Sequence, residues 1–475
     1  MPSKILLIKY YDDLNIRPFP KKAERTLQIY PSLGLGYLAA FLRQNGFPVE
    51  ILDLYALNLP LAEVPQKIAE SKARIVGITA TTVGWPGLLE CAGMVRKALP
   101  QALIVAGGPQ LYLYPQECLS FDRVDLGVVG DGEETFLEIA QKVDGGEKPS
   151  GIRGTVERVE GKPLVNPPRA FIEDLDSLPY PAVDLMPLER YNCLTIAKPF
   201  FTMISSRGCP YRCAFCTQVF CGEKTRLRSP ENVVGEIELY VKRYHAKEII
   251  MFDETFTLSK KRVLETCRLI KENKLAFRFN IRTRADLVDR EILEALKEAG
   301  CYGLHIGVES GDEKILALMN KGITLEQVRE VAELGHRLGF QMRGYFMLGY
   351  LGETRESLQK TIKTAQALPL DWASFSLTTP MPGTELYRQA REQGLIKTDF
   401  WREYTLGKVP PGKELFPHLG SENLSEAELK SWWLKAYTGF YLRPGFMWQK
   451  LMRVKNLQDL QDLFNGCRIL LSLGS

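Results

Sequence analysis

Short apolar runs that alternate with helix-forming stretches extend along most of this 475-residue chain. In the first third, the apolar runs cover residues 5–8, 49–54, 74–80, 102–106 and 124–129, and helical patterns cover residues 33–44 and 86–98. Continuous apolar strands separated by helices are typical of a parallel sheet that is covered on both faces. The sequence therefore predicts that residues 1–150 form a doubly wound α/β domain.

The same alternation returns in the second half of the chain. Apolar runs cover residues 201–206, 248–252, 277–281, 303–308, 342–348 and 373–377, with helical patterns at 230–244, 260–273, 290–299, 325–338 and 355–368. Six strand–helix units in succession predict a second parallel α/β domain over residues 196–395. Functional residues of such domains gather at the carboxyl ends of the strands.

Residues 151–195 differ in character and are interpreted as a linker. Residues 151–165 alternate like a small hairpin around Glu160 and Gly161, and the prolines that follow stiffen an extended crossing. The alternative is that the hairpin is a surface ornament of either domain. Residues 396–475 form a C-terminal extension whose segment 424–451 is helical and rich in Trp, Tyr and Phe.

The aromatic stripe of the extension has two interpretations. The first is packing, with the helix covering the open side of the second domain. The second is a wall for a large, apolar or lipid-like substrate, or a contact with a membrane surface.

Composition narrows the class of protein. A net charge of +4 is small for this length, so no nucleic-acid partner is expected, although the charge suits an anionic substrate. No apolar stretch approaches the roughly 20 residues that cross a bilayer, and the N-terminus lacks a signal-peptide pattern. We therefore expect a cytoplasmic protein, and its ten cysteines do not read as a secreted disulfide framework.

Three of these cysteines form a cluster. Cys209, Cys213 and Cys216 follow an apolar strand with the spacing C-x-x-x-C-x-x-C. Iron–sulfur clusters are bound by cysteine thiolates, which a short loop can bring together, and three thiolates leave one iron of a cubane without a protein ligand. A zinc site with Cys221 as the fourth ligand is the alternative, and a disulfide is disfavoured in a reducing compartment.

The spacing, the aromatic Phe215 before the last cysteine, and the position after a strand resemble the radical S-adenosylmethionine (SAM) superfamily. This resemblance implies a partial (β/α)6 barrel over residues 196–395. It also implies a [4Fe-4S] cluster on Cys209, Cys213 and Cys216, with SAM at the vacant iron and Cys221 as an ordinary thiol.

The resemblance also assigns SAM contacts to residues at the strand ends. The segment Asp253-Glu254 would contact the amino group of SAM, with capping of a helix as the alternative. Arg282 or Arg284 would pair with the carboxylate. Further contacts are expected with the ribose and the adenine, from Glu309, Ser310 and Gly349. His305, inside an apolar run, is interpreted as a core histidine.

Two glycine-rich turns stand at predicted strand ends of the first domain: Gly107-Gly108-Pro109, and the segment with Gly130, Gly132 and Glu133. By spacing alone they are either tight turns or places where a ligand approaches the backbone. Their order resembles the cobalamin-binding domain of many radical SAM enzymes. The histidines stand at 245, 305, 336 and 418, so this domain has no axial histidine for cobalt.

The resemblance implies a mechanism. A reduced cluster would cleave SAM to a 5′-deoxyadenosyl radical. Methylcobalamin would then deliver a methyl group to an unactivated carbon of a small-molecule substrate. A large, apolar small molecule would suit this role. One alternative is an oxidative cyclase of the anaerobic magnesium-protoporphyrin ester type. A second alternative, outside the class of enzymes, is an iron–sulfur sensor. Flavodoxin or ferredoxin would donate the electron. The sequence singles out no catalytic side chain.

Overall fold

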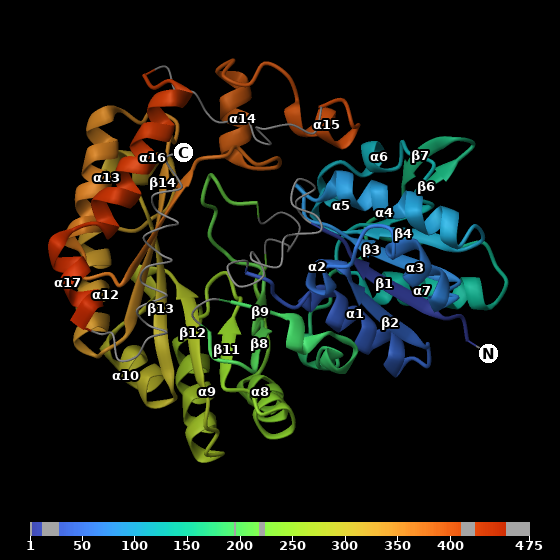
Figure 1. Ribbon diagram of the computed structural model, residues 1–475, viewed down its shortest axis with the longest axis horizontal. Coiled ribbons are helices and arrows are strands. Elements are labelled where there is room, and N and C mark those ends of the chain that lie inside the picture. Colours follow the sequence, from blue (N-terminus) through green and yellow to red (C-terminus); the bar gives the residue numbers. More distant parts are fainter. Residues whose placement is uncertain (1, 12–27, 194–195, 218–223, 410–422, 453–475) are drawn as a thin grey trace.

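The computed structural model describes residues 2–11, 28–193, 196–217, 224–409 and 423–452. Two sheets stand beside each other, each with its own helices (Figure 1). One buried cluster of apolar side chains includes residues of both halves, among them Leu6, Trp85, Tyr350 and Trp401. The two sheets are therefore joined by a shared core.

The N-terminal sheet has the strand order β2-β1-β3-β4-β5-β6-β7. Its parallel strands are β1 (Ile5–Lys9), β2 (Val49–Asp53), β3 (Ile75–Thr79), β4 (Leu103–Gly107) and β5 (Leu126–Val128). Alternate residues of β1 enter different cores: Ile5 and Leu7 pack with α1 (Leu33–Gln44) and α7 (Glu133–Asp144), whereas Leu6 and Ile8 pack with α3 (Val64–Ser71) and α4 (Trp85–Ala98). The doubly wound sheet predicted from the apolar runs is confirmed.

This strand order identifies a candidate binding position in the N-terminal sheet. The order reverses between β1 and β3, so the connections that leave these two strands run to opposite faces. Ligands of doubly wound folds bind outside the carboxyl ends of the strands at such a reversal. The glycine turn after β4 lies one strand away.

The hairpin of residues 151–165 belongs to the N-terminal sheet. Its strands β6 (Thr155–Val159) and β7 (Lys162–Val165) continue the sheet antiparallel beyond β5, and the Val129 amide donates to the Gly154 carbonyl at 2.8 Å. The prediction that this hairpin belongs to the linker is therefore wrong. The outer edge of β5 offers unpaired backbone groups, and the hairpin satisfies them.

The segment that follows the hairpin crosses back over α1. A Cβ atom on Gly36 would lie 2.7 Å from Met186 Cε and 2.9 Å from Pro181 Cβ, so this contact needs glycine. The Tyr191 hydroxyl donates to buried Asp53 at 3.0 Å. These contacts fasten the crossing segment to the N-terminal domain before the chain enters the second sheet.

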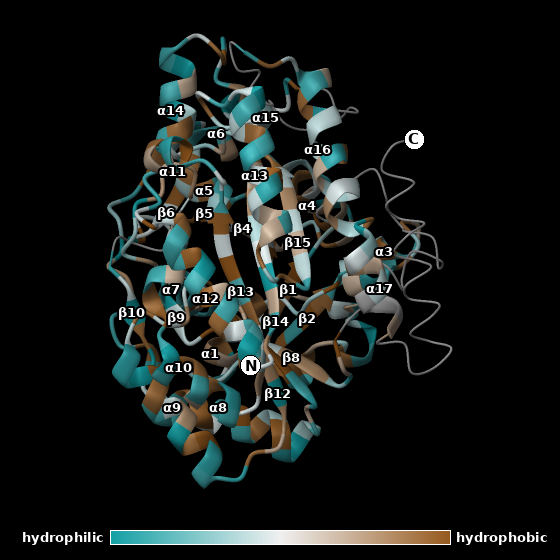
Figure 2. Cartoon of the chain, turned by 90° about the vertical axis from the view of Figure 1, so that its left-hand side faces the viewer, coloured by the Kyte–Doolittle hydropathy of each residue, from teal (hydrophilic) through white to brown (hydrophobic). Residues whose placement is uncertain are grey.

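The second sheet is a parallel partial barrel, as the resemblance implies. Its strand order is β15-β14-β13-β12-β11-β8. The strands are β8 (Phe200–Met203), β11 (Glu248–Met251), β12 (Arg278–Thr283), β13 (Cys301–Glu309), β14 (Gln341–Leu348) and β15 (Trp372–Leu377). The outer helices are α8 (Pro230–Tyr244), α9 (Lys260–Glu272), α10 (Arg290–Glu298), α12 (Leu325–Arg337) and α13 (Arg355–Ala367). In Figure 2, β13 is largely in the hydrophobic colour, whereas helices such as α13 and α14 (Glu385–Glu392) present many hydrophilic residues.

Helix α16 (Glu426–Tyr441) covers the free edge of β15 with aromatic side chains. The Tyr441 hydroxyl bonds to the backbone amide and carbonyl of Ala373, at 3.1 and 2.8 Å. The Tyr437 hydroxyl bonds in the same way to Phe375, at 3.2 and 3.1 Å, and the Trp433 indole donates to the Phe375 carbonyl at 2.8 Å. The aromatic stripe therefore packs on the barrel and hydrogen-bonds its edge.

The extension also reaches the N-terminal domain. Helix α15 (Phe400–Thr405) of the extension, together with α14 (Glu385–Glu392) at the end of the barrel domain, crosses between the two halves at the top of Figure 1. The Trp85 indole donates to the Thr405 carbonyl at 3.0 Å, and the Tyr404 hydroxyl donates to the Val83 carbonyl at 2.6 Å. The C-terminal extension therefore braces both sheets.

The surface of the last described helix, α17 (Pro444–Met452), leaves Trp448 exposed. No helix of the described residues is long and apolar enough to cross a membrane. Contact of the extension with a membrane surface stays a prediction.

We predict that replacing Tyr437 and Tyr441 together by Phe lowers the midpoint of thermal unfolding. Phe keeps the ring packing but leaves backbone groups of β15 without partners, at a cost of about 1–3 kcal/mol for each site. Tyr112→Phe is the control, because no hydrogen bond of its hydroxyl is seen among the described residues. An unchanged midpoint in the double variant would contradict this role.

Candidate functional site

The three cysteines lie in a loop that β8 and the short strand β9 (Ser206–Arg207) lead into. The loop is fixed from both sides: the Ala214 amide donates to the Met319 carbonyl, and the Ala214 carbonyl accepts from the Leu386 amide, both at 2.8 Å. Cys209 is buried, whereas Cys213 and Cys216 are half-buried. The loop is thus held between the helix after β13 and α14.

Two cations stand beside the cysteine loop. Arg284 lies over the Tyr211 ring at 3.6 Å, and its Nη1 is 3.8 Å from the Sγ atom of Cys213. Lys321 lies 5.8 Å from the Phe215 ring. Burial raises the pKa of the Cys213 thiol, while Lys321 and Arg284 act in the opposite direction. The positive charges favour the thiolate form that ligates iron.

These residues fit an iron–sulfur cluster by the chemistry of their donors. Three thiols share one anchored loop next to two cations, which suits a sulfur-rich, negatively charged group. Among the described residues, no three His, Cys, Asp or Glu side chains surround a single metal ion. A cubane does not require this, because each thiolate binds a different iron. Cys221, the fourth ligand of the zinc alternative, lies outside the described residues.

Asp253 is occupied by the turn that precedes the cysteine loop. Its fully buried carboxylate accepts from the Ser205 amide at 3.0 Å, from the Ser205 hydroxyl at 2.7 Å and from the Ser206 hydroxyl at 2.5 Å. The side chain therefore ties the end of β11 to β9, which is neither the SAM contact predicted for it nor the capping alternative. Its SAM contact stays a prediction without support from these hydrogen bonds.

Glu254, its neighbour, has the properties of a ligand-facing group. The side chain is exposed, yet surrounding protein desolvates it and raises its pKa, with Asp253 adding to the effect and Arg282 opposing it. Of the predicted acidic pair, Glu254 is the one left available for the amino group of SAM.

The two predicted arginines occupy different levels of the barrel. Arg284 uses its guanidinium on Asp286, at 2.9 and 3.1 Å, and on the Lys321 carbonyl at 2.7 Å. Arg282 lies two residues deeper along β12, 4.5 Å from the Phe252 ring. The structure therefore brings Arg284, and not Arg282, to the cysteine loop.

The segment after β13 is held from both directions. Glu309 forms a buried ion pair with Lys321 at 2.8 Å, and a Cβ atom on Gly307 would lie 2.4 Å from Glu309 Oε1. Ser310 is fully buried, and its hydroxyl lies 3.2 Å from that of Thr361 on α13. Ser310 therefore anchors the turn, and its predicted contact with the ribose stays untested.

Gly349 ends β14 in a left-handed conformation, with φ of 87°. Its amide donates to Glu353 Oε2 at 2.5 Å, and the Tyr350 amide donates to the same oxygen at 3.1 Å. Glu353 is fully buried, its other oxygen has no hydrogen-bond partner among the described residues, and burial raises its pKa to about 7. The predicted adenine-side turn is thus built around a carboxyl group that is partly protonated at neutral pH.

The carboxyl edge of the N-terminal sheet leaves room beside its backbone. A Cβ atom on Gly107 or on Gly132 would meet no atom of the described part of the chain within 4 Å, whereas one on Gly108, at φ of 112°, would lie 2.2 Å from the Ala80 carbonyl oxygen. Gly108 therefore serves the tight turn before Pro109, and Gly107 and Gly132 border open space. This edge fits a flat ligand that lies against backbone, as predicted for cobalamin.

The turn after β5 contributes charge to the domain interface. Glu133, only 5% exposed, accepts from Arg207 Nη2 at 2.6 Å, and Asp131 accepts from Arg207 Nη1 at 3.2 Å. Asp131 also pairs with buried Arg226 of β10 (Arg226–Leu227). We call these four residues the acid–arginine clamp. It leaves Gly130 and Gly132 as the predicted cobalamin contacts in this turn, because the Glu133 carboxylate is engaged.

Sequence reasoning missed Lys321, Arg207 and Arg226. Lys321 stands in no motif, and only folding brings it to Cys213 and Glu309. For Arg207, a signal is present: it lies two residues before Cys209, and two acids stand in the glycine turn of the other domain.

The comparisons with known proteins agree with this geometry. A family model described as the radical SAM superfamily matches residues 203–365, and one described as a B12 binding domain matches residues 23–140. An uncharacterised methyltransferase of Pyrococcus horikoshii is 35% identical over 419 residues, which cover 87% of this chain and 88% of the relative. The chain belongs to the radical SAM superfamily. A B12-binding domain precedes its radical SAM domain, as predicted.

Two further matches support the arrangement. The anaerobic magnesium-protoporphyrin IX monomethyl ester cyclase of Rubrivivax gelatinosus is 27% identical, over 88% of this chain and 75% of the cyclase. The radical SAM methyltransferase TsrM of Kitasatospora setae, solved with cobalamin and a [4Fe-4S] cluster, has a TM-score of 0.70 and 21% identity, over 83% of this chain and 79% of TsrM. The predicted fold is confirmed, and so is the cofactor set of [4Fe-4S] cluster, SAM and cobalamin.

We predict that Arg207→Gln in this radical SAM enzyme lowers the midpoint of thermal unfolding. The change leaves Glu133 without its cation, and breaking a buried ion pair costs about 3–5 kcal/mol. Adding Glu133→Gln removes the uncompensated charge and should recover part of the loss. The control is Arg388→Gln at an exposed pair, which should change little. Equal effects of the two single variants would contradict a clamp.

Glu353→Gln tests the buried carboxyl group. Because burial raises the pKa of Glu353 from 4.5 to about 7, the stability it contributes is complete below pH 4.5 and is lost as pH rises through 7. The side-chain carbonyl of Gln can still accept the hydrogen bonds from the Gly349 and Tyr350 amides, and Gln carries no charge. Thermal unfolding should be measured for both proteins at pH 5 and pH 8. The free energy of unfolding of the variant relative to the wild type should be higher at pH 8 than at pH 5, by about 3 kcal/mol at most. The same difference at both pH values would disprove this assignment.

Proposed function

We propose that this enzyme is a cobalamin-dependent radical SAM methyltransferase that methylates an unactivated carbon of a small-molecule substrate. The acid–arginine clamp carries the proposal. It joins the turn after β5, at the carboxyl edge of the B12-binding sheet, to Arg207, which lies two residues before Cys209 of the cysteine motif. This contact suits two cofactors that act on one substrate, and the 35% identical relative named a methyltransferase supports the same reading.

The residues of the chain position the groups that react. When bound, the cluster, SAM and cobalamin supply a carbon-centred radical and a transferable methyl group. Cys209, Cys213 and Cys216 would hold the cluster, and Glu254 would accept a hydrogen bond from the amino group of SAM. The anchored turn at Ser310 and the glycine turn at Gly349 would hold the nucleoside in place. A small electron-transfer protein such as flavodoxin or ferredoxin would supply the electron.

An oxidative cyclase is the second candidate, favoured by the cyclase relative that aligns with 88% of this chain. The two functions share cofactors and differ in the fate of the SAM methyl group. Only the methyltransferase transfers that group to the corrinoid and onward.

The test uses protein purified without oxygen, reconstituted with iron and sulfide, and supplied with hydroxocobalamin, dithionite and SAM labelled on its methyl group. We expect 5′-deoxyadenosine by mass spectrometry and label on the corrinoid. Cys213→Ala should abolish 5′-deoxyadenosine formation, and Cys267→Ala, on outer helix α9, should not. 5′-Deoxyadenosine without labelled corrinoid would favour the cyclase, and no cleavage of SAM by a loaded cluster would overturn both functions.

A further inference from the structure

Three basic side chains form a row across the inner face of the barrel. In the strand register, Arg282 of β12 stands opposite His305 of β13, and His305 stands opposite Arg343 of β14. Their strand neighbours Ile281, Leu304 and Met342 are buried in the outer core, under the helices. Because successive residues of a strand point to opposite faces, the three basic side chains face the lumen.

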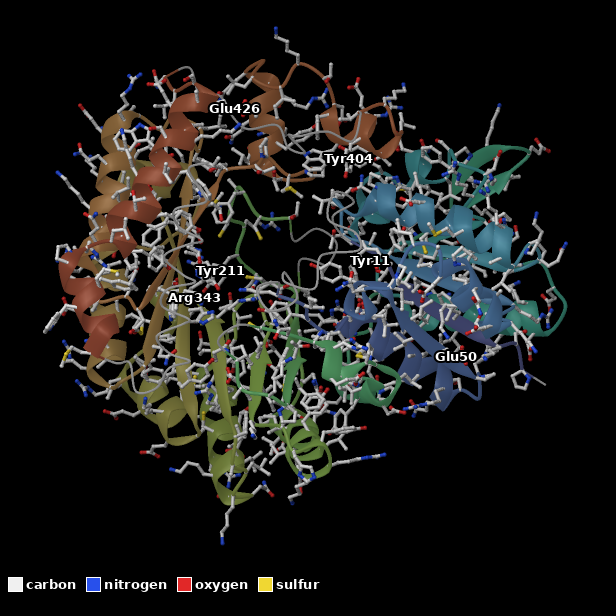
Figure 3. All side chains as sticks on the ribbon, in the orientation of Figure 1. Tyr11, Glu50, Tyr211, Arg343, Tyr404 and Glu426 are labelled. Atoms are coloured by element: carbon white, nitrogen blue, oxygen red, sulfur yellow. The ribbon has the colours of Figure 1, made fainter. Side chains whose placement is uncertain are left out.

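The row lies deep in the barrel. His305 precedes Glu309, at the carboxyl end of β13, by four residues, or roughly 13 Å of strand. In the view of Figure 3, Arg343 lies below Tyr211 of the cysteine loop, among the strands of the barrel. Arg282, His305 and Arg343 each retain accessible surface, so the described residues do not fill the lumen at this level. The row is therefore separate from the Arg284 and Lys321 charges at the cysteine loop.

Arg343 lacks a counter-charge within the described part of the chain. No carboxylate there lies within ion-pair distance of it, and its buried Nε atom has no hydrogen-bond partner. Its guanidinium lies 5.7 Å from the centre of the Trp372 ring. Arg282 differs, because the carboxylate of Glu254 is close enough for Arg282 to lower its pKa.

His305 adds a neutral hydrogen-bonding group between the arginines. Burial moves its pKa well below the usual value, and Arg343 and Arg282 add to the effect. Its Nδ1 atom lies 3.1 Å from the Tyr345 hydroxyl. When Tyr345 donates to Nδ1, the ring carries its proton on Nε2 and can donate it to an oxygen in the lumen.

A partly buried guanidinium without a carboxylate is destabilising unless an anion joins it. The planar fork of arginine matches the oxygens of a carboxylate or a phosphate. We propose that the Arg282–His305–Arg343 row binds an oxyanion group of the substrate. The proposal rests on the function proposed above and adds the substrate class: a small molecule that bears a carboxylate or phosphate at the end away from the reacting carbon.

Calorimetric titration of the reconstituted, cobalamin-loaded protein tests this subsite without SAM or reductant. The probes are inorganic phosphate and acetate, and the expected result is saturable binding of at least one. Arg343→Gln should weaken that binding at least tenfold, and Arg343→Lys should weaken it less. The matched control is Arg337→Gln on the outer surface of α12, which should bind as the wild type does. The preferred probe distinguishes a phosphate from a carboxylate.

Thermal unfolding gives a second, independent readout. Because Gln removes an uncompensated charge, Arg343→Gln should raise the midpoint, whereas loss of a merely structural arginine would lower it. Absence of binding to the wild type up to tens of millimolar, equal binding by Arg343→Gln, or a lowered midpoint would each overturn the proposal. These outcomes do not depend on SAM cleavage, so they stand apart from failure of the proposed methyl transfer.

Discussion

The contact between two carboxylates and two guanidiniums sets the relation between the halves of the molecule. Asp131 and Glu133 belong to a turn of the first sheet, and Arg207 and Arg226 belong to the short strand pair beside the cysteine loop. Buried charges are tolerated only when partners and hydrogen bonds compensate them. The interface therefore has one favourable register, and any sliding of the sheets exposes uncompensated charge.

The barrel separates its positive charges by depth. Near the cysteine loop, Arg284 and Lys321 are neutralised by Asp286 and Glu309, and they act on Cys213 as part of a balanced network. Deeper in the lumen, Arg343 has no such partner among the described residues. The first group lies beside the predicted cluster ligands, and the second is available to the anionic group proposed to enter the barrel.

Much of the fold could be predicted from the sequence, because strand–helix alternation and the cysteine spacing are local patterns. The strand predicted at residues 342–348 forms as Gln341–Leu348, for example. Partner choice is not local. Asp253 and Ser310 stand where the resemblance expects ligand contacts, yet their oxygens bond to Ser205 and Thr361 across the fold. The hairpin at residues 151–165 could be recognised from the sequence, but the strand it pairs with could not. The short strand β5 carries no sequence signal that its outer edge needs a partner.

The aromatic cover on β15 has a consequence for synthesis on the ribosome. All six barrel strands leave the exit tunnel before α16, whose Trp433, Tyr437 and Tyr441 hydrogen-bond the last strand. A nascent barrel therefore spends the translation of about fifty residues with an open strand edge, a surface on which other chains can pair. Helix α16 follows every barrel strand in the sequence and closes this edge without adding a strand.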